Sequence, residues 1–543
     1  MPMRSILFLM LFTSFVCTGQ KYSIILGRPT DKSITASVLL DQNSDYYLEY
    51  GTSAGVYGTK SAIYSGVATV PEEIEIPNLT ANTRYYYRLG YKLKSAITYT
   101  NSPEYSFITQ RSPGSSFTFT VEADEHLYDK KGVDNLYKIC LANQLADKPD
   151  FMLSLGDTFG DDHYPTTITS TELKNLHAYY RPFLGEIAHS VPFYFCLGNH
   201  EGENNFYLPQ NPPNNLTAWA TVWRKYYYPN PSPNAFYTGN TQVEPNGLGL
   251  PENYYAWTWG DALFVVLDAY RYQSASGTSE KPKGWDWTLG KAQYDWLKTT
   301  LEGSKAKYKF VFAHHVRGQD RGAITNAKLY EWGGYEGDGK TYTFPTNRPG
   351  WAKPIHTLFK DTGVSIFFQG HDHLFAKETL DGITYQEVPM PSDSTYQIGM
   401  LANADAYTEN QRDGAGHIRV NVTPTGLKVD YVKAYLPADT KVGGAQNREI
   451  GFSYSLGSPA VITPLVLATE PVAETFKIIP NPASTLFKIE GPPLETLFRL
   501  VNPAGQTVIE TKSREIDVTK IPSGLYFLQA EGYPNALKIQ ITH

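Results

Sequence analysis

The sequence predicts an α/β domain in the middle of the chain, with an all-β sandwich before it and a small all-β domain after it. Between Ser115 and about Tyr435, apolar runs alternate with helical stretches, which is typical of an α/β domain. From residue 21 to about 110, and again after Phe476, short β-rich runs are separated by turn residues, which is typical of all-β structure. A chain of 543 residues is long enough for about three or four domains.

Composition limits the partners of the chain. Hydrophobic residues make up 41% of it, which is ordinary for a protein with buried cores. The formal net charge is -7, so basic residues are not in excess and we expect no specific nucleic-acid partner. Outside the signal segment there are two cysteines, Cys140 and Cys196. A disulfide is permitted outside the cytoplasm, but their apolar surroundings favour buried, inert thiols.

Residues 1–20 have the features of a secretory signal peptide. Met1–Arg4 is short and basic, Ser5–Val16 is apolar, and the next four residues, CTGQ, include small residues suited to cleavage. Cys17 could also suggest a lipid anchor, but the residues ahead of it fit a lipidation site poorly. This apolar run is too short to span a bilayer and no other run is long enough, so we expect no transmembrane segment in the mature chain.

Residues 21–111 are predicted to form the β-sandwich. Asp, Asn, Gly and Thr separate β-rich runs at 33–40, 46–50, 73–76 and 85–91. The closing pattern IPNLTANTRYYYRLGY, followed by SPEYSFIT, resembles a fibronectin type III repeat. The resemblance implies that Leu79 and Tyr85–Tyr87 fill the core, and that the domain is a spacer or docking module rather than a site of chemistry.

Residues 115–437 are the predicted α/β domain. A helix is expected at Val133–Ala146, and strands are expected at Phe117–Val121, Phe151–Leu155, Pro192–Leu197, Leu263–Leu267, Phe310–Ala313 and Val364–Gln369. The segment Asn204–Trp259 interrupts this pattern, and a loop of such length inside a compact domain is usually functional or disordered. Because it directly follows the GNHE motif, we expect it to form a wall over the site. Its aromatic residues could stack on a base or sugar, but packing as a subdomain core is favoured for Trp219, Trp223 and Tyr226–Tyr228.

After a linker at 438–474, residues 475–543 contain short strands and turns. The patterns IPNP, LVNPAG and IPSGLYFL closely resemble the type A C-terminal sorting domain of the type IX secretion system. Such a domain is an address rather than a catalytic site. The resemblance implies that the secretion machinery is a partner and that the protein is secreted or held at the cell surface.

Metal-ligand side chains follow five of the predicted strands. Asp157 comes directly after the run Phe151–Leu155, and the carboxyl end of a buried parallel strand would deliver it to a site. Alone, such an Asp is equally well explained as a helix N-cap or a turn residue. Five motifs in order favour a shared metal site, with Gly156, Gly198 and Gly370 turning the backbone sharply where side chains converge. The motifs are Asp124-Glu125-His126, Gly156-Asp157, Gly198-Asn199-His200-Glu201, His314-His315 and Gly370-His371-Asp372-His373.

This ordered set resembles that of the calcineurin-like metallophosphoesterases. With a preceding β-sandwich it is most similar to the purple acid phosphatase branch, over about residues 22–435. The resemblance implies a four-layer α/β sandwich of mixed sheets flanked by helices, and a dinuclear centre bridged by Asp157. One ion would be held by Asp124, His126, Asp157 and His373, and the other by Asp157, Asn199, His314 and His371.

The ligand chemistry supports the same interpretation. Imidazole, carboxylate and amide oxygen suit two divalent or trivalent ions of Zn, Fe or Mn, whereas the absence of thiolate argues against a soft metal. Two bridged ions can clamp both oxygens of an in-line displacement at phosphorus, with a metal-bound hydroxide as nucleophile. His200 cannot easily point the same way as its neighbour Asn199, so we expect it to face the substrate as a general acid or charge stabiliser.

The sequence departs from the purple acid phosphatases at two places. Those enzymes carry an iron-binding Tyr three positions after the bridging Asp, where this chain has Gly160, so a colourless site is expected. Their usual His-x-Pro motif is replaced here by His314-His315-Val316-Arg317. Strand register favours His314 as the ligand, which leaves His315 near the phosphate.

Several polar residues near the motifs have more than one interpretation. Arg317 and Arg271 could bind a phosphate oxygen in a bidentate manner, although a solvent-facing side chain is the alternative for each. Glu201 could hydrogen-bond a neighbouring imidazole. The apparent spare ligands are better explained as a solvated turn: Asp161, Asp162 and His163.

The sequence therefore predicts a secreted, metal-dependent enzyme that hydrolyses phosphate monoesters of small molecules. A phosphodiesterase or nucleotidase of the same fold is the alternative, because the motifs do not specify the number of ester substituents. A third hypothesis is a surface-displayed binding protein with an inactive metal core. It would be favoured if one of the seven ligands or His200 were missing, and none is missing.

Overall fold

The computed structural model divides the chain into two compact units, Met1–Val461 and Ile462–His543. It describes residues 22–159, 166–204, 208–273, 283–318, 320–398, 401–442, 444–457, 477–490, 496–502, 506–530 and 537–543. The predicted signal peptide and the Asp161–His163 turn lie outside these residues. Among the helices that are described, none has the length and apolar character needed to cross a membrane.

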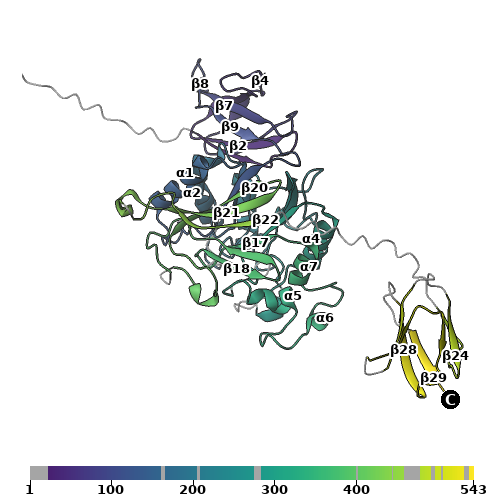
Figure 1. The fold of residues 1–543 in the computed structure, drawn as a ribbon. Coiled ribbons are helices and arrows are strands. Elements are labelled where there is room, and N and C mark those ends of the chain that lie inside the picture. Colours follow the sequence, from purple (N-terminus) through teal and green to yellow (C-terminus); the bar gives the residue numbers. More distant parts are fainter. Residues whose placement is uncertain are drawn as a thin grey trace, which may run out of the picture. The chain divides into compact units, whose positions relative to one another are not determined.

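A β-sandwich opens the first unit, as the sequence predicts (Figure 1). One sheet has the order β1-β2-β6, and the other has the order β4-β3-β7-β8, with β5 added to β3 and β9 added to β7. Leu79, Tyr85 and Tyr87 are buried between the sheets, as expected, whereas Tyr86 is only half-buried because successive strand residues point to opposite faces. The strands are β1 (Tyr22–Gly27), β2 (Ile34–Leu40), β3 (Ser44–Gly51), β4 (Thr59–Lys60), β5 (Tyr64–Gly66), β6 (Glu72–Ile76), β7 (Arg84–Leu93), β8 (Thr100–Asn101) and β9 (Tyr105–Ile108).

Two mixed sheets form the centre of the first unit. The first sheet has the order β12-β11-β10-β20-β21-β22 and the second has the order β13-β14-β15-β16-β17-β19-β18. The strands of the first are β10 (Phe117–Glu122), β11 (Phe151–Ser154), β12 (Phe193–Phe195), β20 (Ala415–Thr423), β21 (Gly426–Ala434) and β22 (Ile450–Gly457). Those of the second are β13 (Thr238–Gly239), β14 (Tyr255–Trp259), β15 (Ala262–Val266), β16 (Tyr308–Phe312), β17 (Ile366–Gln369), β18 (Ala376–Leu380) and β19 (Ile383–Glu387).

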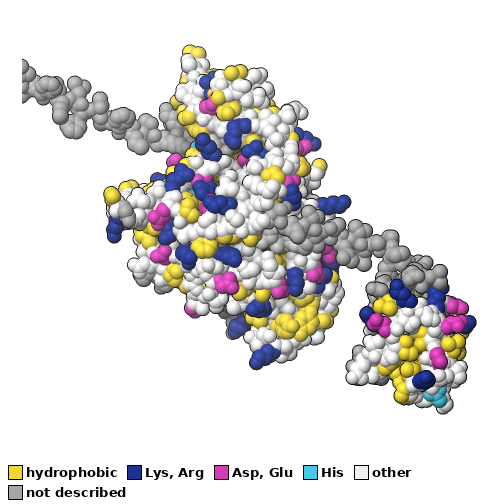
Figure 2. Space-filling model, in the orientation of Figure 1, with side chains coloured by type: hydrophobic (Ala, Val, Ile, Leu, Met, Phe, Trp, Pro, Cys, Tyr) yellow, Lys and Arg dark blue, Asp and Glu magenta, His cyan; other side chains and the backbone are white. Residues whose placement is uncertain are grey.

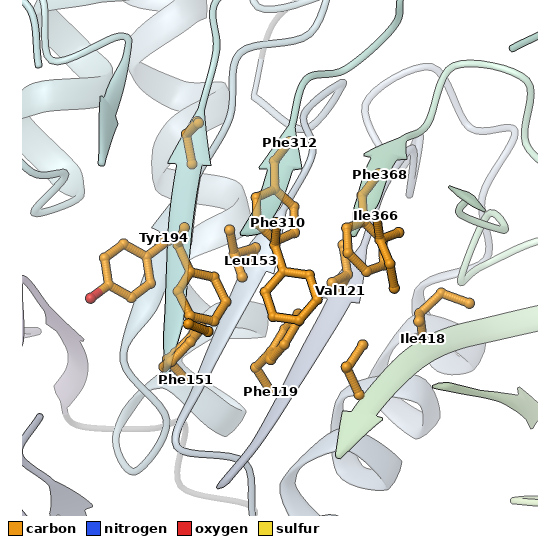
Figure 3. Close-up of a cluster of buried hydrophobic side chains, with 14 of the residues drawn as sticks. Phe119, Val121, Phe151, Leu153, Tyr194, Phe310, Phe312, Ile366, Phe368 and Ile418 are labelled. Atoms are coloured by element: carbon orange, nitrogen blue, oxygen red, sulfur yellow. The ribbon is translucent and has the colours of Figure 1, made fainter. Parts of the chain in front are cut away.

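An aromatic core fills the space between the two sheets (Figure 3). The rings of Phe119 and Phe151, both of the first sheet, stack with their centroids 5.6 Å apart. The centroid of Phe119 also lies 5.3 Å from that of Phe310 and 6.2 Å from that of Phe368, both of the second sheet. Successive strand residues point to opposite faces, so alternate residues of each strand enter this core and the others face outwards. Both faces of the strands that carry the motifs are therefore buried, which explains their continuous apolar runs.

Helices cover the outer faces and complete four layers. Side chains of α1 (Asp134–Ala146) and α2 (Ser170–Ala188) pack on Met152 and Phe195 of the first sheet. Side chains of α4 (Lys291–Gly303) and α7 (Ile355–Thr362) pack on Val311 and Phe367 of the second. Three further helices lie in connections: α3 (Leu216–Tyr227), α5 (Tyr330–Gly333) and α6 (Phe344–Asn347). The α/β four-layer sandwich expected from the sequence is confirmed.

The sheet continues beyond the predicted end of the domain. The sequence places the boundary at residue 437 and a linker at 438–474, but β22 pairs with β21 from Gly426↔Gly457 to Val432↔Ile450. The short run IGFSYSLG has alternating polar residues, which suits an edge strand with one face on the core. This pattern is too short to predict a strand without its partner β21, so the sequence alone places the run in the linker.

The β-sandwich is fastened to the α/β part by buried polar contacts. Arg181 of α2 is 1% exposed and donates to Ser23 Oγ at 2.8 Å, to Ser37 O at 2.7 Å and to the carbonyl of Tyr227. Tyr87 OH adds a hydrogen bond to His189 O at 2.6 Å. A buried guanidinium that donates to both parts fixes their mutual position, so the sandwich is an integral part of this unit rather than a free spacer.

The insertion that the sequence predicts as a wall contains α3, β13 and β14. Leu216 and Ala220 of α3 pack against Leu173 of α2. Trp223 donates its indole N–H to Ser170 Oγ at 2.9 Å, and Tyr228 is 1% exposed. The aromatic side chains of this segment therefore pack as a subdomain core, which is the interpretation that the sequence favours.

The second unit is a small all-β domain. Its two sheets have the orders β23-β24-β27 and β26-β25-β28-β29, around a core that includes Phe487, Phe498 and Leu528. The strands are β23 (Lys477–Ile479), β24 (Leu486–Glu490), β25 (Phe498–Val501), β26 (Thr507–Thr511), β27 (Glu515–Asp517), β28 (Gly524–Ala530) and β29 (Leu537–Ile541).

Charged side chains of both signs are interspersed on the face of each unit that Figure 2 shows. No large basic field is visible there, in keeping with the net charge of -7. Both remaining cysteines, Cys140 and Cys196, are buried and free, as expected.

Candidate metal centre

Two sets of parallel strands bring their carboxyl ends to one place. β10, β11 and β12 run parallel in the first sheet, and β15, β16 and β17 run parallel in the second. Loops after five of these strands carry the predicted ligands, and their side chains converge in overlapping groups whose ligand atoms lie within 4.8 Å of one another. These groups are Asp124/His126/His373, His126/Asp157/His200 and Asp157/His314/His371.

Asp157 lies at the common point of this arrangement. Its side chain is 1% exposed, and Oδ2 lies 3.1 Å from His314 Nε2 and 3.8 Å from His200 Nε2. Oδ1 accepts the backbone N–H of His200 at 2.8 Å. One carboxylate therefore faces side chains from two further loops, which is the geometry that a bridging ligand needs.

Asp124 is the second carboxylate of the centre. Its Oδ2 accepts the backbone N–H of His371 at 2.8 Å, which joins the first and last motifs of the sequence. Its Oδ1 faces the Nε2 atoms of three imidazoles, at 3.5 Å for His373, 3.7 Å for His314 and 3.9 Å for His126.

The facing atoms of His126 and His373 indicate a bound cation. Their Nε2 atoms lie 3.0 Å apart. The other ring nitrogen of His126 lies 3.3 Å from Asp129 Oδ2, and that of His373 lies 2.9 Å from Leu401 O. Leu401 O has no proton, so Nδ1 of His373 donates and its Nε2 keeps its lone pair. Asp129 favours the same tautomer for His126, whose Nδ1 also lies 3.1 Å from Tyr128 OH, a group that can accept as well as donate. Two lone pairs that face each other at this distance repel unless a cation lies between them.

Several buried polar atoms of the centre lack a partner among the described residues. They are Asp124 Oδ1, Asn199 Oδ1, His314 Nε2 and His371 Nε2. Burying such atoms unpaired costs free energy, so native proteins pair them with a protein group, water or an ion. Burial alone would lower the pKa of His314, but the carboxylates of Asp157 and Asp124 raise it to about 10. The carboxylates of the pocket therefore stabilise a positive charge, and the N and O ligand atoms fit an ion of Zn, Fe or Mn.

The backbone is strained at these residues. Five of the seven predicted ligands have positive φ: Asp124 (62°), His126 (45°), Asp157 (60°), His371 (77°) and His373 (62°). Such conformations cost roughly 1–3 kcal/mol each and cluster at functional sites. Here the strain turns each side chain into the centre directly after its strand.

The glycines beside the ligands are required for two different reasons, backbone conformation and space. Gly156 has a φ of 98°, which agrees with the sharp turn expected from the sequence. For Gly198 and Gly370 the reason is space, because a Cβ would collide with the carboxylate of Asp157 at the first position and that of Asp124 at the second. The loops can approach one another this closely only without side chains.

Two comparisons with protein families match separate parts of the chain. Residues 117–375 match the calcineurin-like phosphoesterase model, and residues 477–541 match a secretion system C-terminal sorting domain. The first range contains all the predicted ligands. The central domain is a calcineurin-like phosphoesterase. The chain is therefore a metal-dependent phosphoesterase, and its sorting domain, of the type IX secretion kind, directs it to the cell surface or beyond.

Solved structures show the same fold. The structure of PhoD is 19% identical, with a TM-score of 0.57 over 80% of this chain and 90% of that one. Purple acid phosphatase PPD1 from yellow lupin (Lupinus luteus) seeds is 15% identical, with a TM-score of 0.52 over 80% of this chain and 74% of that one. No curated protein matches the chain.

The adjacent histidines of the phosphoesterase differ in hydrogen bonding. His314 Nδ1 donates to Leu155 O at 2.8 Å, so in the neutral ring, the form that binds a cation, Nε2 carries the lone pair that faces Asp157. His315 Nδ1 instead accepts the backbone N–H of Arg317 at 3.0 Å. The proton of neutral His315 is therefore on Nε2, which is buried and makes no well-directed hydrogen bond among the described residues. One ring offers a lone pair and its neighbour offers a hydrogen-bond donor.

Glu201 joins two ligand loops of the phosphoesterase through the backbone. Its carboxylate accepts N–H groups from Asp157 at 2.9 Å, Thr158 at 2.6 Å, Phe159 at 3.1 Å and Gly198 at 2.5 Å. The sequence suggested an imidazole as its partner, whereas these four bonds use both of its oxygens. Burial raises the pKa of Glu201 to about 7, and the nearby charge of Asp157 acts in the same direction.

Arg271 is held away from the centre. Its side chain is fully buried, pairs with Glu244 and lies 3.4 Å from Glu203 Oε2. Glu203 in turn pairs with the buried Arg224 of α3 at 2.6 Å. The solvent-facing alternative is wrong, because this network buries the guanidinium and ties the insertion to the GNHE loop. The sequence could not show it, because its members are up to 68 residues apart.

The guanidinium of Arg317 also interacts with neighbouring side chains. Its guanidinium lies 4.0 Å from the ring centroid of Tyr330, donates to Asn326 Oδ1 at 3.3 Å and pairs with Asp320 at 2.8 Å. Its side chain is 5% exposed. The contribution that the structure gives it near the centre is the backbone N–H on His315.

Sequence reasoning missed a third arginine, Arg321. Its Nη1 donates to His371 O and to Asp372 Oδ1, each at 2.9 Å, and its side chain is 43% exposed. Its partners lie 50 and 51 residues away, so no local motif indicates this position.

Proposed function

We propose that the chain is a secreted phosphatase that hydrolyses phosphate monoesters of small molecules at a dinuclear metal centre. The observation that carries the proposal is the position of Asp157, which belongs to two of the three groups of potential ligand atoms. Asp124, His126, Asp157 and His373 would hold one ion of Zn, Fe or Mn. Asp157, Asn199, His314 and His371 would hold the second. When bound, two such ions supply a nucleophile from water and neutralise charge on the phosphoryl group.

His200 is the proposed general acid. Its side chain is 17% exposed, which places it on the open side of the centre, and its Nε2 is 3.8 Å from Asp157 Oδ2. The backbone N–H of His200 bonds to the other oxygen of Asp157, so the imidazole is positioned relative to the bridging ligand. It would give a proton to the leaving oxygen or stabilise charge on the phosphoryl group.

His315 is the proposed donor to a phosphoryl oxygen. Its ring centroid lies 5.0 Å from that of His371, and among the described residues its buried Nε2–H has only a weak backbone contact, with Gly322. The neutral form is maintained because burial lowers the pKa of His315 well below its usual range, and the charges of His314, Arg321 and Arg317 lower it further. A neutral imidazole donor can bind an anionic oxygen without a proton change.

A substrate panel tests this function. Purified enzyme loaded with Zn, Fe or Mn is assayed on 4-nitrophenyl phosphate and on bis(4-nitrophenyl) phosphate, with a chelator-treated sample as control. The monoester should be the better substrate, and activity should disappear on chelation and return with metal. Preference for the diester would instead support the phosphodiesterase alternative, and no hydrolysis of either ester by metal-loaded enzyme would contradict both.

A further inference from the structure

Arg321 lies beside the metal centre but is not one of its ligands. Its Nη1 donates to the carbonyl of His371, a proposed ligand, and to Asp372 Oδ1. Asp372 is itself fully buried. Its Oδ2 accepts hydrogen bonds from Gly322 N at 2.9 Å and from Tyr407 OH at 2.7 Å. One edge of the guanidinium is therefore fixed to the loop that carries His371 and His373.

The remainder of the guanidinium is available to a ligand. Nε and Nη2 make no hydrogen bond with any residue that the structure describes, and 43% of the side chain is exposed. Arginine carries its donors in a planar fork that matches carboxylate and phosphate groups. A cation with one edge anchored and the other exposed has already lost part of its rotamer freedom, so it binds an anion at a smaller entropic cost.

The other two arginines of this region cannot serve in the same way. Arg271 is fully buried between Glu203 and Glu244, and Arg317 is 5% exposed and bound to Asp320. Among the three arginines near the centre, Arg321 alone combines exposure with an anchor on a ligand loop. Its anchor is the backbone carbonyl of His371 and not the side chain that would bind metal, so the guanidinium lies beside a proposed ligand without competing for the metal.

We propose that Arg321 recognises a second anionic group of the substrate, a carboxylate or further phosphate on the part of the molecule that leaves. This inference rests on the proposed function and names its substrate class: phosphate monoesters whose alcohol carries another negative charge. In this arrangement His200 and His315 interact with the phosphoryl group, and Arg321 binds the second anionic group on the alcohol.

Binding of two phosphonates, which the enzyme cannot hydrolyse as esters, tests the proposal. Calorimetry on metal-loaded enzyme compares methylphosphonate, with one anionic group, and 3-phosphonopropionate, which adds a carboxylate. Wild-type enzyme should bind the second about tenfold more tightly, since hydrogen bonds to charged groups contribute more than neutral ones. Arg321→Gln should remove this difference and leave the affinity for methylphosphonate within about twofold. Arg321→Lys, which keeps the charge without the fork, should restore part of the difference.

Arg88→Gln is the matched control. Arg88 pairs with Glu49 on the β-sandwich and is 33% exposed, so its removal changes the net charge equally but away from the centre. This variant should keep the full difference between the ligands. Metal content, measured on each sample, should be unchanged.

The two proposals fail in different ways. If wild-type, metal-loaded enzyme binds neither phosphonate, both the proposed function and the role of Arg321 are contradicted. If it binds both equally, or if Arg321→Gln weakens both equally, the proposed function stands and the role of Arg321 is wrong.

Discussion

The ligand set and the rim of the metal centre use neighbouring residues in opposite ways. The proposed ligand set consists of Asp124, His126, Asp157, Asn199, His314, His371 and His373, and the proposed rim consists of His200 and Arg321. Ligand atoms such as Asn199 Oδ1 and His371 Nε2 are buried and face inwards without a partner. The rim side chains are 17% and 43% exposed, and each residue is anchored to a ligand residue, His200 by its backbone N–H.

The proposed roles therefore separate metal binding from substrate handling between neighbouring residues. His200 follows Asn199 directly, and Arg321 is bonded to the backbone of His371. A change in the ligand set should therefore remove metal and activity together, whereas a change at the rim should affect activity or ligand choice alone. The variants below test that separation.

Asp157→Asn should have the largest effect. The amide keeps the size of the side chain but removes the charge that two ions would share, so both should be bound weakly. We expect less than one metal ion per chain after dialysis and a loss of turnover of at least about 10³-fold. Elemental analysis and an esterase assay measure the two quantities. Retention of the full metal content by this variant would contradict the bridging role.

His200→Ala should reduce turnover while metal content stays at the wild-type value. General acid catalysis contributes typically about 10²- to 10⁴-fold, and we expect a loss in that range. The loss should be smaller for 4-nitrophenyl phosphate than for an alkyl phosphate, because the less basic leaving oxygen needs less help from an acid. Full activity on the alkyl ester would show that the assignment of His200 is wrong.

Glu201→Gln changes neither a proposed ligand nor a rim residue. It should have the smallest effect on turnover when metal is saturating. Its carboxylate accepts four backbone N–H groups, and an amide would place its own N–H₂ against some of them. We expect a loss of about 1–3 kcal/mol in the free energy of unfolding and a 10- to 100-fold weaker metal affinity. Thermal unfolding and metal titration measure these values. With saturating metal, turnover should recover to near the wild-type value; a permanent loss would place Glu201 in the chemistry itself.

Much of the fold could be predicted because its signals are local. The apolar runs that become β10, β11, β16 and β17 are buried on both faces, so they stand out as continuous stretches in the sequence. The ligand motifs follow them directly, and parallel strands place those ends together. β22 was assigned to a linker because its alternating pattern is meaningful only beside β21.

The parts of the centre that could not be predicted depend on distant partners. Glu201 accepts backbone N–H groups of residues 157–159. Nearly every residue type has such a group, so the sequence does not reveal these partners. The sequence singles out Arg271 and not Arg321, but Glu203 and Glu244 bury the first, whereas the second is anchored on His371 and 43% exposed. Which arginine is exposed beside the centre is decided by tertiary contacts.

Metal stoichiometry tests the central claim most directly. The claim is that side chains from five loops hold two ions that share the carboxylate of Asp157. Elemental analysis of the purified enzyme, after exchange into metal-free buffer, should give two ions of Zn, Fe or Mn per chain. A value of one or none, from enzyme that is fully active, would contradict the account.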